Sequence, residues 1–405
     1  MGKLRVLVIS ERYWPEGSGG ELATHLIVDI LSKEFGVTVV TGTRNPHKIP
    51  RVDYIYEPLL SKREKPLLWP NTMRLVRMER FRKLVRKADI VYIPRFVFPV
   101  IPFAKKLGKK VVVHLHGYIP ISYTATILAP YEEHRDRIVR DDVFLECIKG
   151  LKHCLGVGSL WWLPKLAKEW ILQADKVVCV SRRQAEIIID QVPKLRDKIE
   201  VVYNSLPLEL ISNKPRKEVD DVPTFLYVGG DSYIKGFHIL LQAMKHLGRQ
   251  GVKARFIFAG VYSQRNLLAL KQLGEKHRSL EINVVERVEH SELLKLHQKA
   301  WALIFPSIVE EPLPYAVVEA SVLGTIPIAA KVGGVVELLG NSITSEYMFT
   351  PSRYVELAEK LIDLYSLNVD EVRTLSLKLR SHVLLKLDRR KIEEKIALIF
   401  TDYAL

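Results

Sequence analysis

The sequence lacks the features that would mark a membrane-spanning, disulfide-stabilised or zinc-binding protein. No apolar run reaches the roughly 18 residues that a transmembrane helix needs. The three cysteines, Cys147, Cys154 and Cys179, are too few for a disulfide framework, and their spacing matches no zinc pattern. Met1 is followed by neither a long apolar stretch nor a small-residue cleavage site, so we expect no secretory signal and a cytoplasmic location.

Length and composition favour two ordinary globular domains. The chain has 405 residues, of which 48% are hydrophobic and 26% are charged, so it shows no signature of disorder. One hydrophobic core rarely serves more than about 300 residues, and two domains of roughly 200 residues are expected. Asparagine and glutamine are scarce beside abundant Lys, Arg and Glu, which favours a thermophilic source.

The net charge of +15 is concentrated in the first half of the chain. Residues 1–200 hold 35 Lys and Arg against 22 Asp and Glu, whereas the rest holds 26 against 24. We therefore expect the first half to meet something anionic. Because no recognised DNA- or RNA-binding motif is present, nucleic acid is not the expected partner.

Short β-branched runs alternate with amphipathic segments in both halves, which predicts an α/β fold with parallel sheets and right-handed crossovers. The strands expected in the first half are Leu4–Ile9, Val37–Thr41, Ile90–Ile93, Val111–Leu115, Lys176–Val180 and Ile199–Val202. Those expected in the second half are Thr224–Val228, Arg255–Ala259, Ile282–Val285, Ala302–Phe305 and Thr325–Ala329. Ligands of such doubly wound sheets bind at the carboxyl ends of the strands.

The polar, proline-containing stretch Ser205–Pro223 is predicted to be the linker. The expected domains are 1–205 and 206–387, with a final helix at about 388–405 that packs back on the first. Pro70–Lys87 is predicted to be one cationic helix capped by Asn71. The pattern between Tyr118 and Gln173 predicts no fold.

Two strand ends in the first half carry candidate binding residues. Gly17-Ser18-Gly19-Gly20-Glu21 opens a helix, where glycines let a phosphate approach free backbone N–H groups. A simple tight turn explains the same pattern. His114-Leu115-His116-Gly117 ends a strand, and alternation puts both imidazoles on one face of the sheet. From the residues alone, a structural histidine is the better interpretation of either one, and a hydrogen bond from His116 to a substrate hydroxyl is the alternative.

Two further motifs lie in the second half. The strand ending in Gly229-Gly230 is followed by Lys235, whose ammonium can neutralise a diphosphate or simply be solvated. The stretch Pro306–Ala320 contains Pro312 and Pro314, which fit a helix start. Glu311 precedes that helix, and Glu319 is expected two turns into it. An acid among Val, Ala and Leu is best explained by a ligand whose hydroxyls it binds.

Taken in order, these motifs resemble family 4 of the retaining glycosyltransferases, which have the GT-B fold of two Rossmann-like domains facing across a cleft. The resemblance spans nearly the whole chain. The matching motifs are Gly19-Gly20, His116-Gly117, Val178–Ser181, Asn204, Gly229…Lys235-Gly236, Gly260, the pair Glu311/Glu319, and Gly333-Gly334 with Glu337.

The resemblance implies a nucleotide-sugar donor, a UDP- or GDP-sugar, and no essential metal. It places Glu311 on the donor sugar's hydroxyls, Glu319 on the nucleotide ribose, and Lys235 on the diphosphate. Other residues that it assigns to the donor or sugar are Gly19, Gly20, His116, Gly229, Gly230, Pro312 and Leu313.

The chain departs from the family's pattern at Gly230, where an arginine is usual, and at Glu286, where a glycine is usual. Two other readings therefore remain open: a nucleotide-sugar epimerase of the same layout, and a non-catalytic nucleotide-sugar-binding protein.

We expect the acceptor to be a glycan or a lipid-linked hydroxyl, reached at an anionic membrane surface. Seven cations crowd the expected helix Pro70–Lys87. Trp161, Trp162 and Trp170 are predicted to form an interfacial anchor. The alternative is that the apolar stripe of the helix packs on the sheet while its arginines are solvated or in ion pairs.

Overall fold

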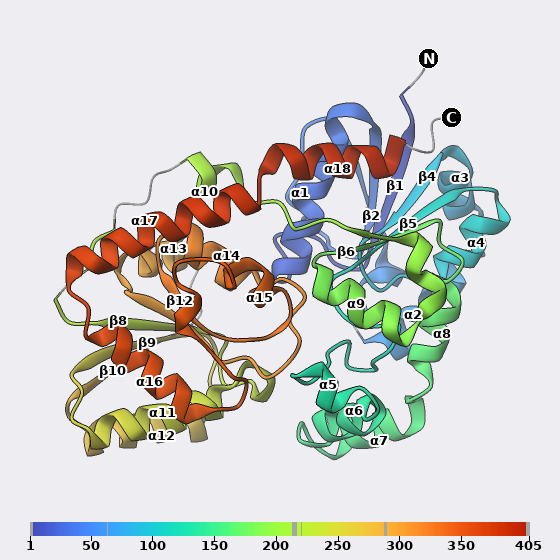
Figure 1. Ribbon diagram of the computed structural model, residues 1–405. Coiled ribbons are helices and arrows are strands. Elements are labelled where there is room, and N and C mark those ends of the chain that lie inside the picture. The colour runs from blue at the N-terminus through green and yellow to red at the C-terminus, as the bar shows by residue number, and fades with distance from the viewer. Residues whose placement is uncertain (1–2, 63, 213–216, 220, 287–289, 402–405) are drawn as a thin grey trace. The chain divides into compact units, whose positions relative to one another are not determined.

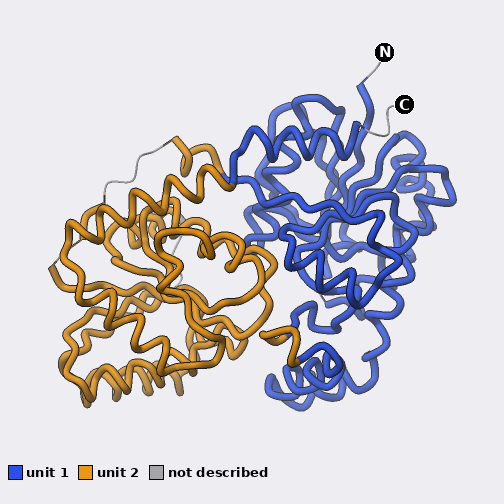
Figure 2. Tube along the Cα trace, in the orientation of Figure 1, with its two compact units in different colours: residues 1–127, 134–206, 387–405 blue, residues 128–133, 207–386 orange. Residues whose placement is uncertain are grey.

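The computed structural model describes residues 3–62, 64–212, 217–219, 221–286 and 290–401. The chain divides into two compact units (Figure 2). Unit 1 comprises residues 1–127, 134–206 and 387–405, and unit 2 comprises residues 128–133 and 207–386. The short segment 128–133 therefore belongs to unit 2, although both of its flanks lie in unit 1.

Unit 1 is built on a seven-stranded sheet in the order β3-β2-β1-β4-β5-β6-β7, and neighbouring strands of this sheet are parallel. The strands run from Arg5–Ser10 (β1), Gly36–Thr41 (β2), Val52–Tyr56 (β3), Ile90–Ile93 (β4), Lys110–Leu115 (β5), Lys176–Cys179 (β6) and Ile199–Val201 (β7). The central strands β1, β4 and β5 are buried almost throughout, as continuous apolar runs in parallel sheets should be.

The helices of unit 1 connect these strands (Figure 1). They are α1 (Gly19–Glu34), α2 (Lys65–Leu75), α3 (Glu79–Lys87), α4 (Val100–Lys106), α6 (Ile138–Cys147), α7 (Leu151–Leu160), α8 (Leu163–Ile171), α9 (Arg182–Gln191) and α18 (Arg389–Thr401), with α5 (Tyr131–His134) at the unit boundary. The C-terminal helix α18 lies against α1. Phe400 of α18 packs on Phe35 and Tyr92, and Lys33 Nζ pairs with Glu393 at 3.0 Å.

Unit 2 is built on a six-stranded sheet in the order β10-β9-β8-β11-β12-β13. Its strands are Thr224–Val228 (β8), Ala254–Ala259 (β9), Leu280–Val285 (β10), Ala302–Phe305 (β11), Ile326–Ala330 (β12) and Met348–Phe349 (β13). Its helices are α10 (Leu208–Ser212), α11 (Phe237–Arg249), α12 (Gln264–Lys276), α13 (His290–Lys299), α14 (Tyr315–Val322), α15 (Gly333–Leu339), α16 (Tyr354–Tyr365) and α17 (Val369–Lys386).

Each sheet has one point at which the strand order reverses. In unit 1 the chain first extends from β1 to β2 and β3, and then returns to add β4 on the other side of β1. Unit 2 repeats this pattern, with β8 and β11 as the central neighbours. Crossovers leave such a switch point in opposite directions, so a crevice opens at the carboxyl ends of the two central strands. The fold therefore directs attention to the residues after β1, β4, β8 and β11.

The expected strands are all present, and the class of two parallel α/β sheets is confirmed. The edge strands β3 and β13 were not predicted, because Val52–Tyr56 is half exposed and Met348–Phe349 is only two residues long. The predicted linker contains the helix α10. Its Pro215 lies outside the described residues, as do residues 402–405 of the predicted final helix.

The prediction of one helix over Pro70–Lys87 is wrong. The chain forms α2, which begins at Lys65 and carries Pro70 inside it, and then α3, which begins at Glu79. The extended backbone of Met78 (φ −77°, ψ 128°) separates them.

The segment between Tyr118 and Gln173, for which the pattern predicted no fold, forms α5 to α8. Its cysteines also form one disulfide, between Cys147 and Cys154, which the sequence did not suggest. Within the described ranges, no helix combines the length and the apolar character needed to cross a bilayer.

Candidate active site

Lys235 stands at the end of a short 3-10 helix, Tyr233–Lys235, after β8. The following Gly236 has a left-handed backbone (φ 73°), and a Cβ there would lie 1.8 Å from the Pro306 carbonyl oxygen. Glycine is therefore required, because it lets the turn after β8 approach the loop after β11. The close approach brings Lys235 to Glu311, and the Nζ to Oε1 distance is 2.5 Å.

Glu311 contacts Ser307 within the loop after β11, and a backbone hydrogen bond ties this loop to the turn that carries Lys235. Ser307 Oγ lies 3.2 Å from Glu311 Oε1, and Ile308 N–H donates to the Ile234 carbonyl oxygen at 3.1 Å. The side chain of Glu311 is 15% exposed and that of Lys235 is 34% exposed. The two groups thus form a preorganised ion pair that a ligand can reach.

Glu310, which precedes Glu311 in the chain, has a structural role. It is 3% exposed, and its carboxylate accepts hydrogen bonds from the backbone N–H groups of Gly333 at 2.7 Å and Tyr131 at 2.8 Å. Gly334 N–H in turn donates to the Glu311 carbonyl oxygen at 2.9 Å. The carboxylate therefore ties α15 and segment 128–133 to the loop that carries Glu311.

Gly333 must be glycine at this contact. Its φ is 48°, and a Cβ would lie 1.9 Å from the Glu311 carbonyl oxygen. The Gly333-Gly334 pair thus supports the backbone of the acid that the resemblance places on the sugar.

Glu319 lies on the buried helix α14 and is 5% exposed. The helix begins at Tyr315, with Pro314 as its N-cap, so the start predicted at Pro312 is three residues too early. Glu319 is consequently one turn into the helix rather than two. Leu313 is buried and Pro312 is half-buried in the loop before it.

The Gly229-Gly230 turn follows β8 directly. Gly230 has a left-handed backbone (φ 61°), and a Cβ there would lie 2.6 Å from the Val261 carbonyl oxygen. Tyr227 Oη also donates to the Gly230 carbonyl at 3.0 Å. The departure from arginine at this position therefore has a physical basis, because neither the backbone conformation nor the space admits a side chain.

In unit 1, Gly19 and Gly20 begin α1, and Ser18 is the N-cap. The Glu21 carboxylate accepts the Ser18 N–H at 2.8 Å, which completes a capping box. Glu21 is fully buried and pairs with Arg95 Nη2 at 3.0 Å.

Arg95 links the glycine turn to the end of β1. Its Nε lies 3.2 Å from Glu11 Oε1, and a Cβ on Gly20 would lie 2.5 Å from its Nη1. Arg95 therefore fixes the turn in place by charge and by shape.

His114 and His116 stack with ring centroids 4.5 Å apart. His114 Nδ1 contacts Tyr92 Oη at 2.9 Å, and burial lowers the pKa of His114 to about 3. The pKa of His116 is well below its usual value, mainly because the ring is buried and also because His114 and Arg95 lie nearby. Both imidazoles are therefore neutral at pH 7. They line a small cavity together with Arg95 and Phe96.

Within each unit, the structure places the expected residues in the segments that follow strands of the sheet. In unit 2, Gly229, Gly230, Lys235 and Glu311 lie after the central strands β8 and β11, and Glu319 lies on the helix after β11. In unit 1, Gly19 and Gly20 follow β1, and His116 follows β5. Among the described residues, no group of three or more His, Cys, Asp or Glu side chains is placed to hold a metal ion.

Sequence reasoning missed Glu11, Arg95 and Glu310. Glu11 and Arg95 immediately follow the neighbouring strands β1 and β4. The rule that parallel strands end at one edge would have suggested their contact. Glu310 gives no such signal, because its carboxylate accepts hydrogen bonds from backbone N–H groups 179 and 23 positions away.

The two parallel α/β sheets are those of the GT-B fold. The family described as Glycosyltransferase Family 4 matches residues 18–210, and the family described as Glycosyl transferases group 1 matches residues 211–377. Together they span most of the chain, and the chain belongs to family 4 of the glycosyltransferases.

Two curated relatives illustrate the similarity. The gpi3 subunit of phosphatidylinositol N-acetylglucosaminyltransferase from Schizosaccharomyces pombe is 26% identical over 204 residues, which are 48% of this chain and 44% of the relative. Glycogen synthase of Mycobacterium tuberculosis is 26% identical over 248 residues, 59% of this chain and 58% of the relative. The chain thus spans about half the length of these relatives.

Solved structures confirm the GT-B fold. Anabaena HepE in complex with UDP-glucose superimposes with a TM-score of 0.69 at 17% identity, covering 98% of this chain and 100% of that one. An Escherichia coli trehalose-6-phosphate protein bound with UDP-2-fluoro glucose gives a TM-score of 0.66 at 14% identity and covers 98% of each chain.

Proposed function

We propose that this protein transfers a hexose from a nucleotide sugar to a hydroxyl acceptor with retention of anomeric configuration. The observation that carries the proposal is the Lys235–Glu311 pair at the switch point of unit 2. One ammonium and one carboxylate side by side suit a ligand that has a diphosphate next to sugar hydroxyls. Binding of the donor exchanges one ion pair for two sets of charge-assisted hydrogen bonds.

Lys235 stabilises the leaving diphosphate, because negative charge grows on it as the glycosidic bond breaks. Glu311 binds the sugar's hydroxyls and orients its anomeric carbon. Glu319 binds the ribose from the buried face of α14. Backbone N–H groups of the Gly229-Gly230 turn take the place of the arginine that this chain cannot accommodate.

His116 is proposed to contact a hydroxyl of the transferred sugar. Its imidazole is neutral, so it can donate or accept a hydrogen bond without adding charge near a developing oxocarbenium ion. No candidate residue is a carboxylate placed as a covalent nucleophile. Retention is therefore assigned to a front-face reaction, in which the leaving phosphate accepts the proton of the incoming hydroxyl.

UDP- and GDP-sugars are the proposed donors, and a glycan or lipid-linked hydroxyl is the proposed acceptor. The UDP-glucose complex of HepE supports a uridine donor. The reaction is proposed to need no metal, because Lys235 supplies the positive charge at the diphosphate.

A donor panel with a simple sugar alcohol or membrane extract as acceptor tests the proposal. We expect nucleoside diphosphate release with one donor, unchanged turnover in excess EDTA, and an NMR spectrum of the product with the donor's anomeric configuration. An inverted product or a requirement for Mg²⁺ would overturn the mechanism. Conversion of the donor sugar without an acceptor would instead identify an epimerase.

A further inference from the structure

The hairpin of α6 and α7 in unit 1 exposes an unusual number of large apolar side chains. Leu151 and Leu155 of α7 are 74% and 64% exposed. The apolar hairpin face, as we call it, consists of Phe144, Ile148, Leu151, Leu155, Trp161 and Trp162, each of which is at least 43% exposed. A surface helix normally turns such residues toward the core.

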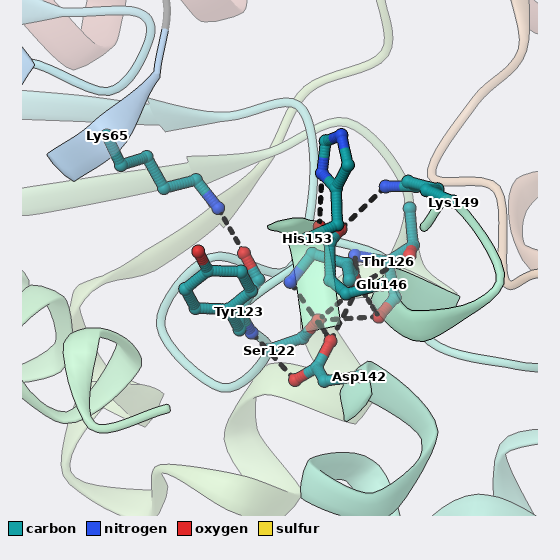
Figure 3. A network of polar contacts seen from close by, with 9 residues as sticks. Lys65, Ser122, Tyr123, Thr126, Asp142, Glu146, Lys149 and His153 are labelled. Atoms are coloured by element: carbon teal, nitrogen blue, oxygen red, sulfur yellow. Dashed lines mark hydrogen bonds and ion pairs between the residues drawn. The ribbon is translucent and has the colours of Figure 1, made fainter. Parts of the chain in front are cut away.

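The buried side of α6 carries two acids, Asp142 and Glu146, beside the apolar Ile138 and Leu145. Asp142, which is 3% exposed, accepts hydrogen bonds from Ser122 Oγ at 2.8 Å and Tyr123 N–H at 2.7 Å (Figure 3). Glu146, one turn later, binds Lys149 at 2.6 Å and His153 at 3.1 Å. The hydrogen bonds of Asp142 therefore help to dock the hairpin onto unit 1, those of Glu146 join residues of the hairpin itself, and several large apolar side chains remain exposed.

The disulfide fixes the outward residues relative to one another. Cys147 at the end of α6 is bonded to Cys154 in α7. Phe144 and Ile148 lie three residues before and one after the first cysteine, and Leu151 and Leu155 hold the same places around the second. Residues four apart share one helix face, so each helix presents a pair of apolar side chains beside the crosslink.

Cations surround this face. Arg137, Arg140, Lys149, Lys152 and Lys165 are all exposed. Among the described residues, Arg137, Arg140 and Lys152 form no ion pair. Lys165 Nζ lies 4.6 Å from the centre of the Trp161 ring. Beside α6, an open groove of about 850 Å³ is lined by Arg135, Arg137 and Arg140 together with Asp136 and Val139.

The cationic helix α3, by contrast, has no free apolar stripe. Phe81 and Val85 are buried against the sheet, and Arg80 and Arg86 pair with Glu57 and Glu79. The expected membrane contact through residues 70–87 is thus not supported by the packing.

Trp170 cannot be part of an interfacial anchor either. It is 8% exposed and packs edge-on against Trp69. Of the three tryptophans expected there, only Trp161 and Trp162 are exposed.

We propose that the apolar hairpin face docks on an anionic phospholipid surface. Exposed leucine, phenylalanine and tryptophan insert at the headgroup boundary, while arginine and lysine stems extend to lipid phosphates. The combination favours an anionic leaflet over a protein partner, since, within the part of the chain that the structure describes, Arg137, Arg140 and Lys152 border the apolar residues without an ion pair of their own and two exposed tryptophans lie on the same face. Membrane docking does not depend on the transfer reaction, so the two proposals can be tested separately.

Vesicle flotation of the full chain tests the proposal. The protein should float with vesicles of phosphatidylglycerol and phosphatidylcholine at low salt, and remain below pure phosphatidylcholine vesicles. Leu151→Glu with Leu155→Glu should reduce the bound fraction by at least about tenfold, because apolar insertion is lost and like charge is added. The matched control, Leu377→Glu with Leu385→Glu, replaces leucines that are 63% and 78% exposed in unit 2 and should float like the wild type.

A second pair of variants separates the two basic surfaces. Arg137→Gln, Arg140→Gln and Lys152→Gln together should weaken flotation, whereas Arg74→Gln, Arg77→Gln and Lys83→Gln remove the same charge near α3 and should not. Equal losses in both triple variants, or unchanged flotation of the double glutamate variant, would overturn the proposal. A dimer in light scattering that the double variant disrupts, without flotation, would assign the face to self-association.

Discussion

Lys235 Nζ and Glu311 Oε1 lie 2.5 Å apart in unit 2, although 76 positions separate the residues in the chain. Two glycines make this contact possible. Gly236 lets the turn after β8 meet the Pro306 carbonyl, and Gly333 lets α15 meet the Glu311 backbone. The pair is consequently a product of close backbone packing at the carboxyl ends of β8 and β11.

The adjacent acids Glu310 and Glu311 should differ in how much stability is lost when each is replaced. Glu310→Ala leaves two buried N–H groups without their acceptor and should cost about 2–4 kcal/mol, or roughly 5–15 °C in the melting temperature of unit 2. Glu311→Ala removes a partly exposed ion pair and should cost less than about 1 kcal/mol. Differential scanning calorimetry of the two variants measures both effects. Equal destabilisation would contradict the assignment of a structural and a ligand-binding acid.

Removal of the Lys235 charge should affect chemistry more than donor binding. We expect Lys235→Ala to lower kcat/KM by about 10²–10³-fold, with most of the loss in kcat, because leaving-group charge is largest in the transition state. Lys235→Arg keeps the charge and should retain part of the rate. Steady-state kinetics with the preferred donor give both constants. A kcat unchanged in Lys235→Ala would place the diphosphate cation elsewhere.

An arginine introduced at position 230 should not improve the enzyme. The left-handed backbone and the Val261 carbonyl at 2.6 Å predict that Gly230→Ala and Gly230→Arg both destabilise unit 2, by about 2–4 kcal/mol. Gly251 offers a matched control, because its φ is 70° but no atom lies within 4 Å of its Cβ position. Gly251→Ala should cost only the backbone contribution of about 1 kcal/mol. Thermal melts that rank the two alanine variants equally would refute the steric argument.

Acid should destabilise unit 1 through its buried histidines. Burial lowers the pKa of His114 to about 3, whereas the unfolded chain protonates at about 6.5. The unfolded state therefore binds more protons between these values, and stability is lost as the pH falls from about 6.5 toward 3. His25, with a pKa lowered to about 4, adds to the effect. His114→Asn should make the dependence shallower by up to about 1.4 kcal/mol per pH unit. Denaturant melts at several pH values give this slope, and an unchanged slope would count against a neutral buried His114.

Strand positions and the class of fold could be predicted because buried parallel strands are continuous apolar runs. Val6–Ile9 and Ala302–Phe305 are such runs, and the residues that follow them therefore lie at the switch point of each sheet. Lys235 and Glu311 were found for this reason, supported by the order of the family's motifs.

Other features depend on contacts that no local pattern encodes. Arg95 acts through Glu11 and Glu21, which are distant in sequence, and Glu310 acts through backbone groups. The helix α6 lies in the segment for which the pattern predicted no fold. Its buried side combines Asp142 and Glu146 with Ile138 and Leu145, so hydrophobic periodicity alone does not mark the side that packs. The break at Met78, where the backbone is extended, was likewise not revealed by local helix propensity.

The central claim is that Glu311 holds a nucleotide sugar for transfer. The most direct test compares nucleoside diphosphate release by the wild type and Glu311→Gln, which keeps the shape of the side chain, across UDP-, GDP- and ADP-sugars with an acceptor present. We predict release from one donor by the wild type and a loss of at least about 10²-fold in Glu311→Gln, with the melting temperature nearly unchanged. Equal turnover in the two proteins, or none with any donor, would contradict the account.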